Sequence, residues 1–127
     1  MTIKEKAEKA AMLKKSGACN CCQAVTAVLC DEESIDTVMK LASGFAVGMG
    51  NMEGTCGALV GAAMAAGLKT NGSGTVRYSK RIQELFVKRC GSSICKDLKG
   101  YGSDRPPVPC DRCVYEAVLA YGEIMGE

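Results

Sequence analysis

The chemistry open to this chain rests on its thiols. It has nine cysteines among 127 residues and no histidine. Without histidine, the usual base partner of a catalytic cysteine and the usual haem ligand are missing, so a transition metal would be held mainly by sulfur. Sulfur donors indicate an iron–sulfur cluster, zinc or copper(I). In a reducing compartment such a cysteine set predicts a metal or redox site rather than a disulfide framework.

One cysteine lies in a distinctive local pattern. Cys56 follows a glycine-rich stretch and precedes a run of small, uncharged residues that reaches Gly67. Thr55 is a favourable N-cap, so the pattern predicts a buried helix that begins at Cys56. A thiol there faces the positive end of the helix dipole and unpaired N–H groups, which favour the thiolate. Taken alone, the stretch equally fits a packed core helix whose cysteine is only a small hydrophobe.

Three more cysteines stand where a helix is expected to begin. Asn20 precedes the first of them, Ser92 and Ser93 precede the second, and Pro109 precedes the third. Helix N-termini that converge on one centre offset the negative charge of several thiolates. Four thiolates complete the ligand shell of a [2Fe–2S] cluster, a [4Fe–4S] cluster or a structural zinc ion. The predicted metal ligands are Cys21, Cys56, Cys95 and Cys110, with Cys22 and Cys113 as extra candidates, and the glycines expected to donate N–H groups to the cofactor are Gly48, Gly50, Gly54 and Gly57.

The elements that must position these residues are helices, because no segment alternates with period two over a useful length. We expect an all-α fold, a compact single domain over residues 1–127 with about five to six helices and cysteines at helix N-termini. Gly57, Gly61 and Ala65 recur at four-residue spacing and would let a neighbouring helix approach closely. The expected helices are one over 3–16, a second over 21–30 capped by Asn20, a third capped by Ser34, a fourth from Cys56, and a fifth from a Thr75 cap to Cys90. A short turn over 92–100 capped by Ser92 or Ser93, an irregular stretch over 100–109 and a last helix from Cys110 are expected to follow.

Composition excludes several classes of function. The net charge is +2, and there is no Trp, with two Phe and four Tyr, so neither a polyanion-binding surface nor aromatic stacking for nucleic acid is indicated. The N-terminal residues lack the apolar core of a secretory signal. The uncharged run after Glu53 is shorter than the roughly 20 residues of a membrane-spanning helix. We therefore expect a cytoplasmic protein without a nucleic-acid or membrane partner.

Four pieces of the chain together resemble the C_GCAxxG_C_C family of redox-active proteins. The pieces are NCCQAV (20–25), GMGNMEGTCGALVGAAM (48–64), SSICKDL (92–98) and CDRCVYEA (110–117). The resemblance implies that the four family cysteines fall on Cys21, Cys56, Cys95 and Cys110. The family is similar to the non-haem domain of split-Soret cytochromes, which implies an iron–sulfur cluster held by four cysteines in a helical domain. No cytochrome is implied, because CDRCV lacks the histidine of a CxxCH haem-attachment motif.

The chain departs from the family pattern at two features. It has GFAVGMGN where relatives often have more consecutive glycines. It also carries five further cysteines, each expected to be a buried small residue or a spare thiol rather than a ligand: Cys19, Cys22, Cys30, Cys90 and Cys113.

Three functions are compatible with these residues. The favoured one is electron transfer or redox sensing through an iron–sulfur cluster, with [2Fe–2S] preferred. The second is thiol–disulfide exchange, in which Cys110 attacks a disulfide and Cys113 resolves it, although the βαβ context of that motif is missing. The third is a structural zinc site of four thiolates. Without a phosphate-binding loop or a nucleophile elbow, we expect an accessory that serves a redox partner protein more than an independent enzyme, and a homodimer through small-residue helix faces stays open.

Overall fold

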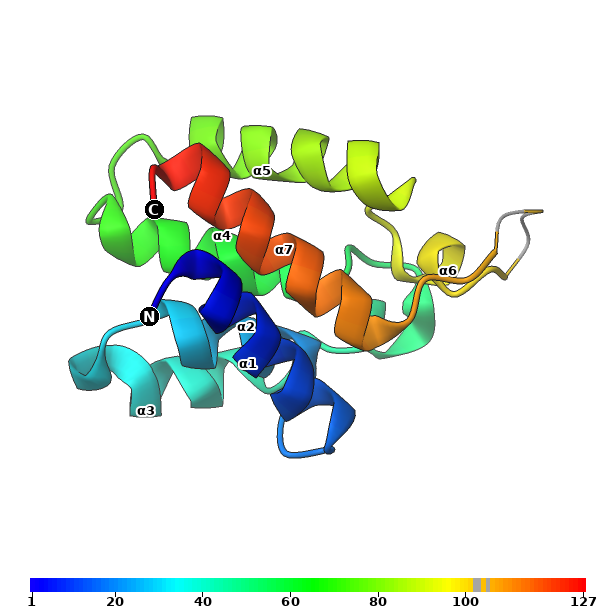
Figure 1. Ribbon diagram of the computed structural model, residues 1–127, viewed down its shortest axis with the longest axis horizontal. Coiled ribbons are helices and arrows are strands. Elements are labelled where there is room, and N and C mark those ends of the chain that lie inside the picture. Colours follow the sequence, from blue (N-terminus) through cyan, green and yellow to red (C-terminus); the bar gives the residue numbers. More distant parts are fainter. Residues whose placement is uncertain (102–103, 105) are drawn as a thin grey trace.

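The computed structural model describes residues 1–101, 104 and 106–127, and its described part is built from helices (Figure 1). No strand occurs there, and one isolated bridge pairs Thr55 with Ile94. The all-α prediction is confirmed, and the helical elements slightly outnumber the five to six expected. In chain order they are α1 (Ile3–Lys15), α2 (Cys21–Leu29), α3 (Glu32–Ala42), the π-type helix η1 (Gly48–Met52), α4 (Gly57–Lys69), α5 (Thr75–Cys90), α6 (Cys95–Leu98) and α7 (Cys110–Met125).

The element that the sequence did not predict is η1. It is one wide turn rather than a regular helix, because Met49 and Gly50 within it have φ values of 67° and 90°. Val47 before it also has a positive φ, 53°, which is unusual for a β-branched residue. Such a backbone persists only where surrounding contacts hold it, so local pattern could not predict it. The expected irregular stretch 100–109 includes residues 102, 103 and 105, which lie outside the described residues, and its described part forms no helix before Cys110.

The cap predicted for α2 is confirmed. The Asn20 side chain accepts a hydrogen bond from the Gln23 amide at 2.9 Å, and the Gln23 side chain accepts one from the Asn20 amide at 3.2 Å. This reciprocal capping box satisfies two N–H groups at the helix start. It fixes the position of Cys21 as the first residue of α2.

Two predicted caps lie inside their helices. The N-cap of α3 is Asp31 rather than Ser34, because Glu32 and Glu33 extend the first turn and complement the helix dipole. The N-cap of α5 is Gly74, with φ of 68°, rather than Thr75. The Thr75 hydroxyl is hydrogen-bonded to Thr70 at 2.7 Å instead.

The caps predicted for α4 and α6 are also wrong. Cys56 itself is the N-cap of α4, because Thr55 belongs to the bridge with Ile94. Ile94 is the N-cap of α6, and the Ser92 hydroxyl accepts a hydrogen bond from the Ile94 amide at 3.1 Å. The cysteines nevertheless stand at the helix starts as predicted, since α6 begins at Cys95 and α7 at Cys110.

Small residues on α4 allow α2 to approach closely, as predicted. A Cβ atom built on Gly61 would lie 2.8 Å from the carbonyl oxygen of Cys22 and 3.1 Å from Cβ of Val25. The core is therefore rich in alanine and valine, with a few larger side chains such as Phe86 and Tyr121. Tight packing of small side chains brings the helix backbones together.

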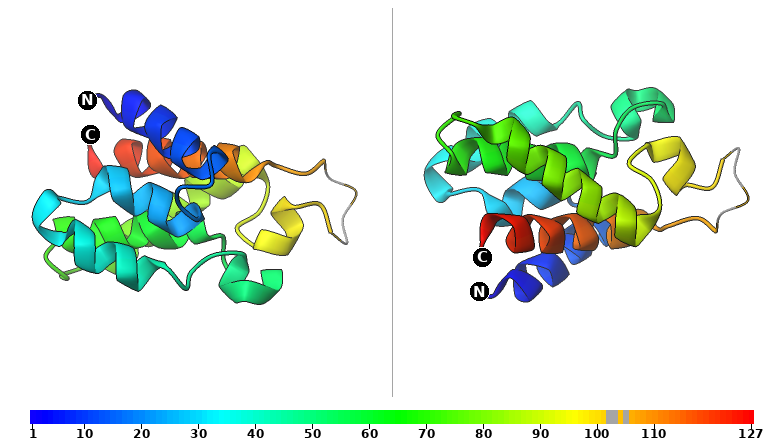
Figure 2. Two further views of the ribbon diagram at one scale, coloured as in Figure 1. Left: turned by 90° about the horizontal axis from the view of Figure 1, so that it is seen from below. Right: turned by 90° about the horizontal axis from the view of Figure 1, so that it is seen from above.

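The elements that carry the predicted ligands gather at one end of the molecule. In Figures 1 and 2, η1, α6 and the first turn of α7 lie at the same end, while the two termini lie together at the other. α1 runs along α7, and α5 covers α4 and α7. Among the described residues, no helix is both long and apolar enough to cross a membrane.

Candidate functional site: a cavity lined by cysteines

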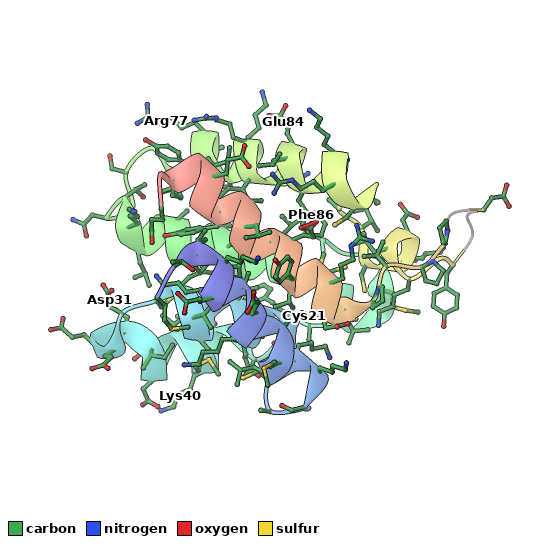
Figure 3. All side chains as sticks on the ribbon, viewed as in Figure 1. Cys21, Asp31, Lys40, Arg77, Glu84 and Phe86 are labelled. Atoms are coloured by element: carbon green, nitrogen blue, oxygen red, sulfur yellow. The ribbon has the colours of Figure 1, made fainter. Side chains whose placement is uncertain are left out.

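The predicted ligands line one partly enclosed cavity of about 80 Å³. Its lining includes Cys21, Cys56, Cys95 and Cys110, together with Cys113. These residues come from α2, α4, α6 and α7, so the whole fold builds the site. Figure 3 labels Cys21, which lies beside the N-terminal part of α7. All nine cysteines are free thiols.

Backbone hydrogen bonds hold Cys56 and Cys95 side by side. The Cys56 amide donates to the Ser93 carbonyl at 2.7 Å, and the Cys95 amide donates to the Gly54 carbonyl at 3.1 Å. The isolated bridge between Thr55 and Ile94 lies between these two hydrogen bonds. The two thiols are thus positioned by main-chain geometry rather than by flexible side chains.

The glycines predicted to contact the cofactor differ in position. Gly57 lines the cavity. A Cβ on Gly48, which has φ of 53°, would lie 2.7 Å from Cβ of Cys95. The Gly54 amide donates to the Gly48 carbonyl at 2.9 Å, and Gly50 is exposed. Gly48 and Gly54 therefore allow the chain to pass close to Cys95, and contact with a cofactor stays a prediction for all four glycines.

The side chains of Cys21 and Cys110 are hydrogen-bonded to each other. Hydrogen bonding with Cys21 lowers the pKa of Cys110 to about 6, and the charges of Lys99 and Lys14 lower it further, against the effect of partial burial. The same hydrogen bond and burial raise the pKa of Cys21 well above its usual range. The hydrogen bond therefore favours a Cys21 thiol beside a Cys110 thiolate.

Cys56 and Cys113 form a second pair of this kind. Hydrogen bonding with Cys113 lowers the pKa of Cys56, and the amides of Ala58 and Leu59 lower it as well, against the effect of burial. The hydrogen bond and burial raise the pKa of Cys113. Burial also raises the pKa of Cys95. The cavity thus has two sulfurs that favour the thiolate before any ligand binds.

The remaining cysteines lie away from the cavity lining. Cys22 is fully buried, and its thiol contacts the Met64 sulfur at 3.7 Å, so the structure does not bring this extra candidate to the cavity. Burial raises the pKa of Cys22 to about 12 and that of Cys30 and Cys90 to about 11. Burial raises the pKa of Cys19 too. Their role as packing residues or spare thiols stays a prediction.

Sequence reasoning missed two residues of the site. Lys14 and Lys99 also line the cavity. Each lies near the end of its helix, in the last turn of α1 and at the C-cap of α6. No motif marks them, and only the approach of α1 and α6 to the cysteines reveals their position.

The cavity is lined by sulfur atoms but has no preformed single-ion site among the described residues. Within the described ranges, no three Cys, Asp or Glu side chains are arranged to hold a single metal ion. The cavity nevertheless holds several times the 10–15 Å³ or so that one water molecule needs. Thiols on several sides of such a space are the donors that iron–sulfur clusters use.

The described helices and this cavity define a small, cysteine-rich, helical protein. The chain belongs to the C_GCAxxG_C_C family, whose model carries the description "Putative redox-active protein" and matches residues 19–124. No curated protein and no solved structure matches the chain. The family match includes all five cysteines that line the cavity, whereas Lys14 on α1 lies outside it.

Proposed function

We propose that this protein binds an iron–sulfur cluster through Cys21, Cys56, Cys95 and Cys110 and serves in electron transfer or redox sensing. The observation that carries the proposal is the shared cavity, because residues far apart in the sequence bring their thiols to it from separate helix starts. A bound cluster would supply one-electron redox chemistry. We favour a [2Fe–2S] cluster, with [4Fe–4S] as the alternative.

The geometry favours a cluster over structural zinc. A structural zinc ion needs four ligand atoms on one centre, with sulfur about 2.3 Å from the metal. No group of three or more suitable side chains in the described part of the chain has such an arrangement. The thiols instead surround a space of about 80 Å³.

The protein's own contribution is to position and stabilise the thiolates. The bridge between Thr55 and Ile94 fixes the spacing of two proposed ligands. The amides of Ala58 and Leu59 favour the thiolate of Cys56. Such groups around a cluster tune its potential and its affinity for the protein.

The test is anaerobic reconstitution with ferrous iron and sulfide. The wild type should bind both and develop a visible absorption band. Cys56→Ser should lower the bound iron about tenfold or more, whereas Cys30→Ser is the matched control, because Cys30 lines a different pocket with Tyr121 and Glu127. A colourless, iron-free wild type would contradict the proposal, and stoichiometric zinc in its place would favour the zinc site.

Thiol–disulfide exchange is a second candidate because Cys110 and Cys113 lie on the first turn of α7 with different exposure. Cys110 is partly exposed, and Cys113 is 3% exposed behind it. The Cys110 thiolate would attack a substrate disulfide, form a mixed disulfide and release one thiolate. Cys113 would then lose its proton to the hydrogen-bonded Cys56 thiolate, attack the Cys110 sulfur and release the second thiolate. Full exchange activity in Cys113→Ser would remove this candidate.

A further inference from the structure

The cavity is lined by two lysines and by no carboxylate of the described residues. Lys14 and Lys99 are the charged side chains among its lining residues. Both are half-buried, whereas their neighbours on the same helices, Lys15 and Lys96, are exposed. The two ammonium groups approach the thiols from different elements, α1 and α6.

Neither lysine has an ion-pair partner in the part of the chain that the structure describes. The ion pairs there involve Lys6, Lys40, Lys69 and Arg89. Partial burial of an unpaired ammonium group costs free energy, because it loses solvation without gaining a counter-charge. Negative charge in the adjacent cavity would offset that cost.

The charges of both lysines reach the proposed ligands. After the hydrogen bond with Cys21, Lys99 and Lys14 are the groups that lower the pKa of Cys110. Burial raises the pKa of Cys95, and Lys99 opposes this rise. Lys14 opposes the rise in the pKa of Cys21 that its hydrogen bond and burial cause. Both lysines therefore act on sulfurs at the same cavity.

We infer that Lys14 and Lys99 set the reduction potential of this centre by stabilising its more negative, reduced form. The inference rests on the proposed function. Reduction takes one electron from a one-electron donor and adds one negative charge to the cavity. Two nearby positive charges in a partly desolvated site favour the form with the extra charge. They therefore raise the potential relative to a cavity without them.

A role in helix stability is the alternative explanation, because lysines at helix C-termini interact favourably with the dipole. Lys15 shares the last turn of α1, and Lys96 lies on α6, but both are exposed and absent from the cavity lining. The Lys15→Gln/Lys96→Gln double variant therefore matches the Lys14→Gln/Lys99→Gln double variant in net charge and in the two elements that are altered, α1 and α6. The two pairs differ in whether the lysines face the cavity.

The experiment compares the midpoint potentials of the full-length chain after anaerobic reconstitution. Dithionite is the reductant, redox mediators are present, and the visible absorption follows the titration. At a fixed potential, the double variant Lys14→Gln/Lys99→Gln should show about a tenfold lower ratio of reduced to oxidised protein than the wild type. For a one-electron couple this corresponds to a midpoint potential that is lower by about 59 mV. The Lys15→Gln/Lys96→Gln pair should keep the wild-type potential, and a Lys14→Arg/Lys99→Arg pair should restore most of the shift.

Each result decides between the inference and the proposed function. If the Lys14→Gln/Lys99→Gln double variant binds iron and sulfide fully but keeps the wild-type potential, the inference is overturned and the proposed cluster stands. The same holds if the Lys15→Gln/Lys96→Gln double variant shows an equal shift in potential. Iron-free wild type would overturn both. If the glutamine pair binds no cluster, normal loading of the arginine pair supports the role of charge. If neither the glutamine nor the arginine double variant binds the cluster, the lysines act through side-chain packing rather than charge, and the inference is overturned.

Discussion

Cys110 differs from the other thiols of the cavity in combining partial exposure with a low pKa. It is the first residue of α7, and its pKa of about 6 follows from hydrogen bonding with Cys21 and from the charges of Lys99 and Lys14. Cys21 itself stays protonated, because the same interaction raises its pKa. One member of the pair is therefore a ready ligand or nucleophile at neutral pH.

The pH dependence of alkylation tests this assignment. In the reduced, metal-free protein, the rate at which iodoacetamide modifies Cys110 should rise with pH through a midpoint near 6, because only the thiolate reacts. Cys21→Ala removes the main cause of the low pKa, so the midpoint should move upward. Cys30→Ala should leave it unchanged. Peptide mass spectrometry after short exposure measures the rate, and a midpoint near the ordinary thiol value with Cys21 present would contradict the pairing.

At the scale of elements, the contact between α2 and α4 decides whether Cys21 and Cys56 reach the same cavity. Gly61 allows this contact, because any side chain there would meet the Cys22 carbonyl. Gly67 lies further along the same helix, and a Cβ there would meet nothing within 4 Å. The two glycines thus serve as a matched pair on one helix.

Substitution of these glycines by alanine should have opposite effects on stability. Gly61→Ala should lower the free energy of unfolding by about 1–3 kcal/mol, because the helices must separate. Gly67→Ala should raise it by about 0.5–1 kcal/mol, because alanine restricts the unfolded chain and favours the helix. Urea unfolding followed by circular dichroism measures both. A neutral Gly61→Ala would show that the α2–α4 contact yields without cost.

At the scale of the whole molecule, Glu127, which follows α7, links that helix to α1 and α4 at the end opposite the cysteine cavity. Its carboxylate lies 2.6 Å from the Lys69 ammonium on α4 and 3.7 Å from that of Lys6 on α1. Although partial burial opposes it, Lys69, Lys6 and Tyr121 together lower the pKa of Glu127. A carboxylate with a lowered pKa stabilises the fold above its unfolded pKa, and this contribution is lost as the pH falls through the folded pKa.

Glu127→Gln should therefore destabilise the protein at neutral pH but not in acid. The expected loss is up to about 1 kcal/mol at pH 7, as for a partly exposed ion pair. The difference from wild type should shrink below about pH 4.5, where the free glutamate protonates, and vanish below the folded pKa. Asp36→Asn is the control, because the Asp36–Lys40 pair is 91% and 80% exposed. Urea unfolding at several pH values gives the comparison, and a pH-independent difference would exclude the ionic contribution.

Local physics determined the helices and the cysteines at their starts. The capping box of Asn20 and Gln23 places Cys21, and the proline before Cys110 marks the start of α7, so both were predictable from neighbouring residues. The uncharged, small-residue pattern after Cys56 likewise predicted the buried helix and its close packing. These features depend on interactions within one or two helical turns.

Tertiary structure alone decided how the thiols pair and what charge surrounds them. The pairs Cys21–Cys110 and Cys56–Cys113 join helices distant in the sequence, and the CxxC motif around Cys110 predicted neither. The bridge that displaces Thr55 from its expected cap, and the lysines that line the cavity, also arise from contacts between distant segments. Such contacts form only when the packed core sets the separation of the helix backbones, and no local pattern contains that information.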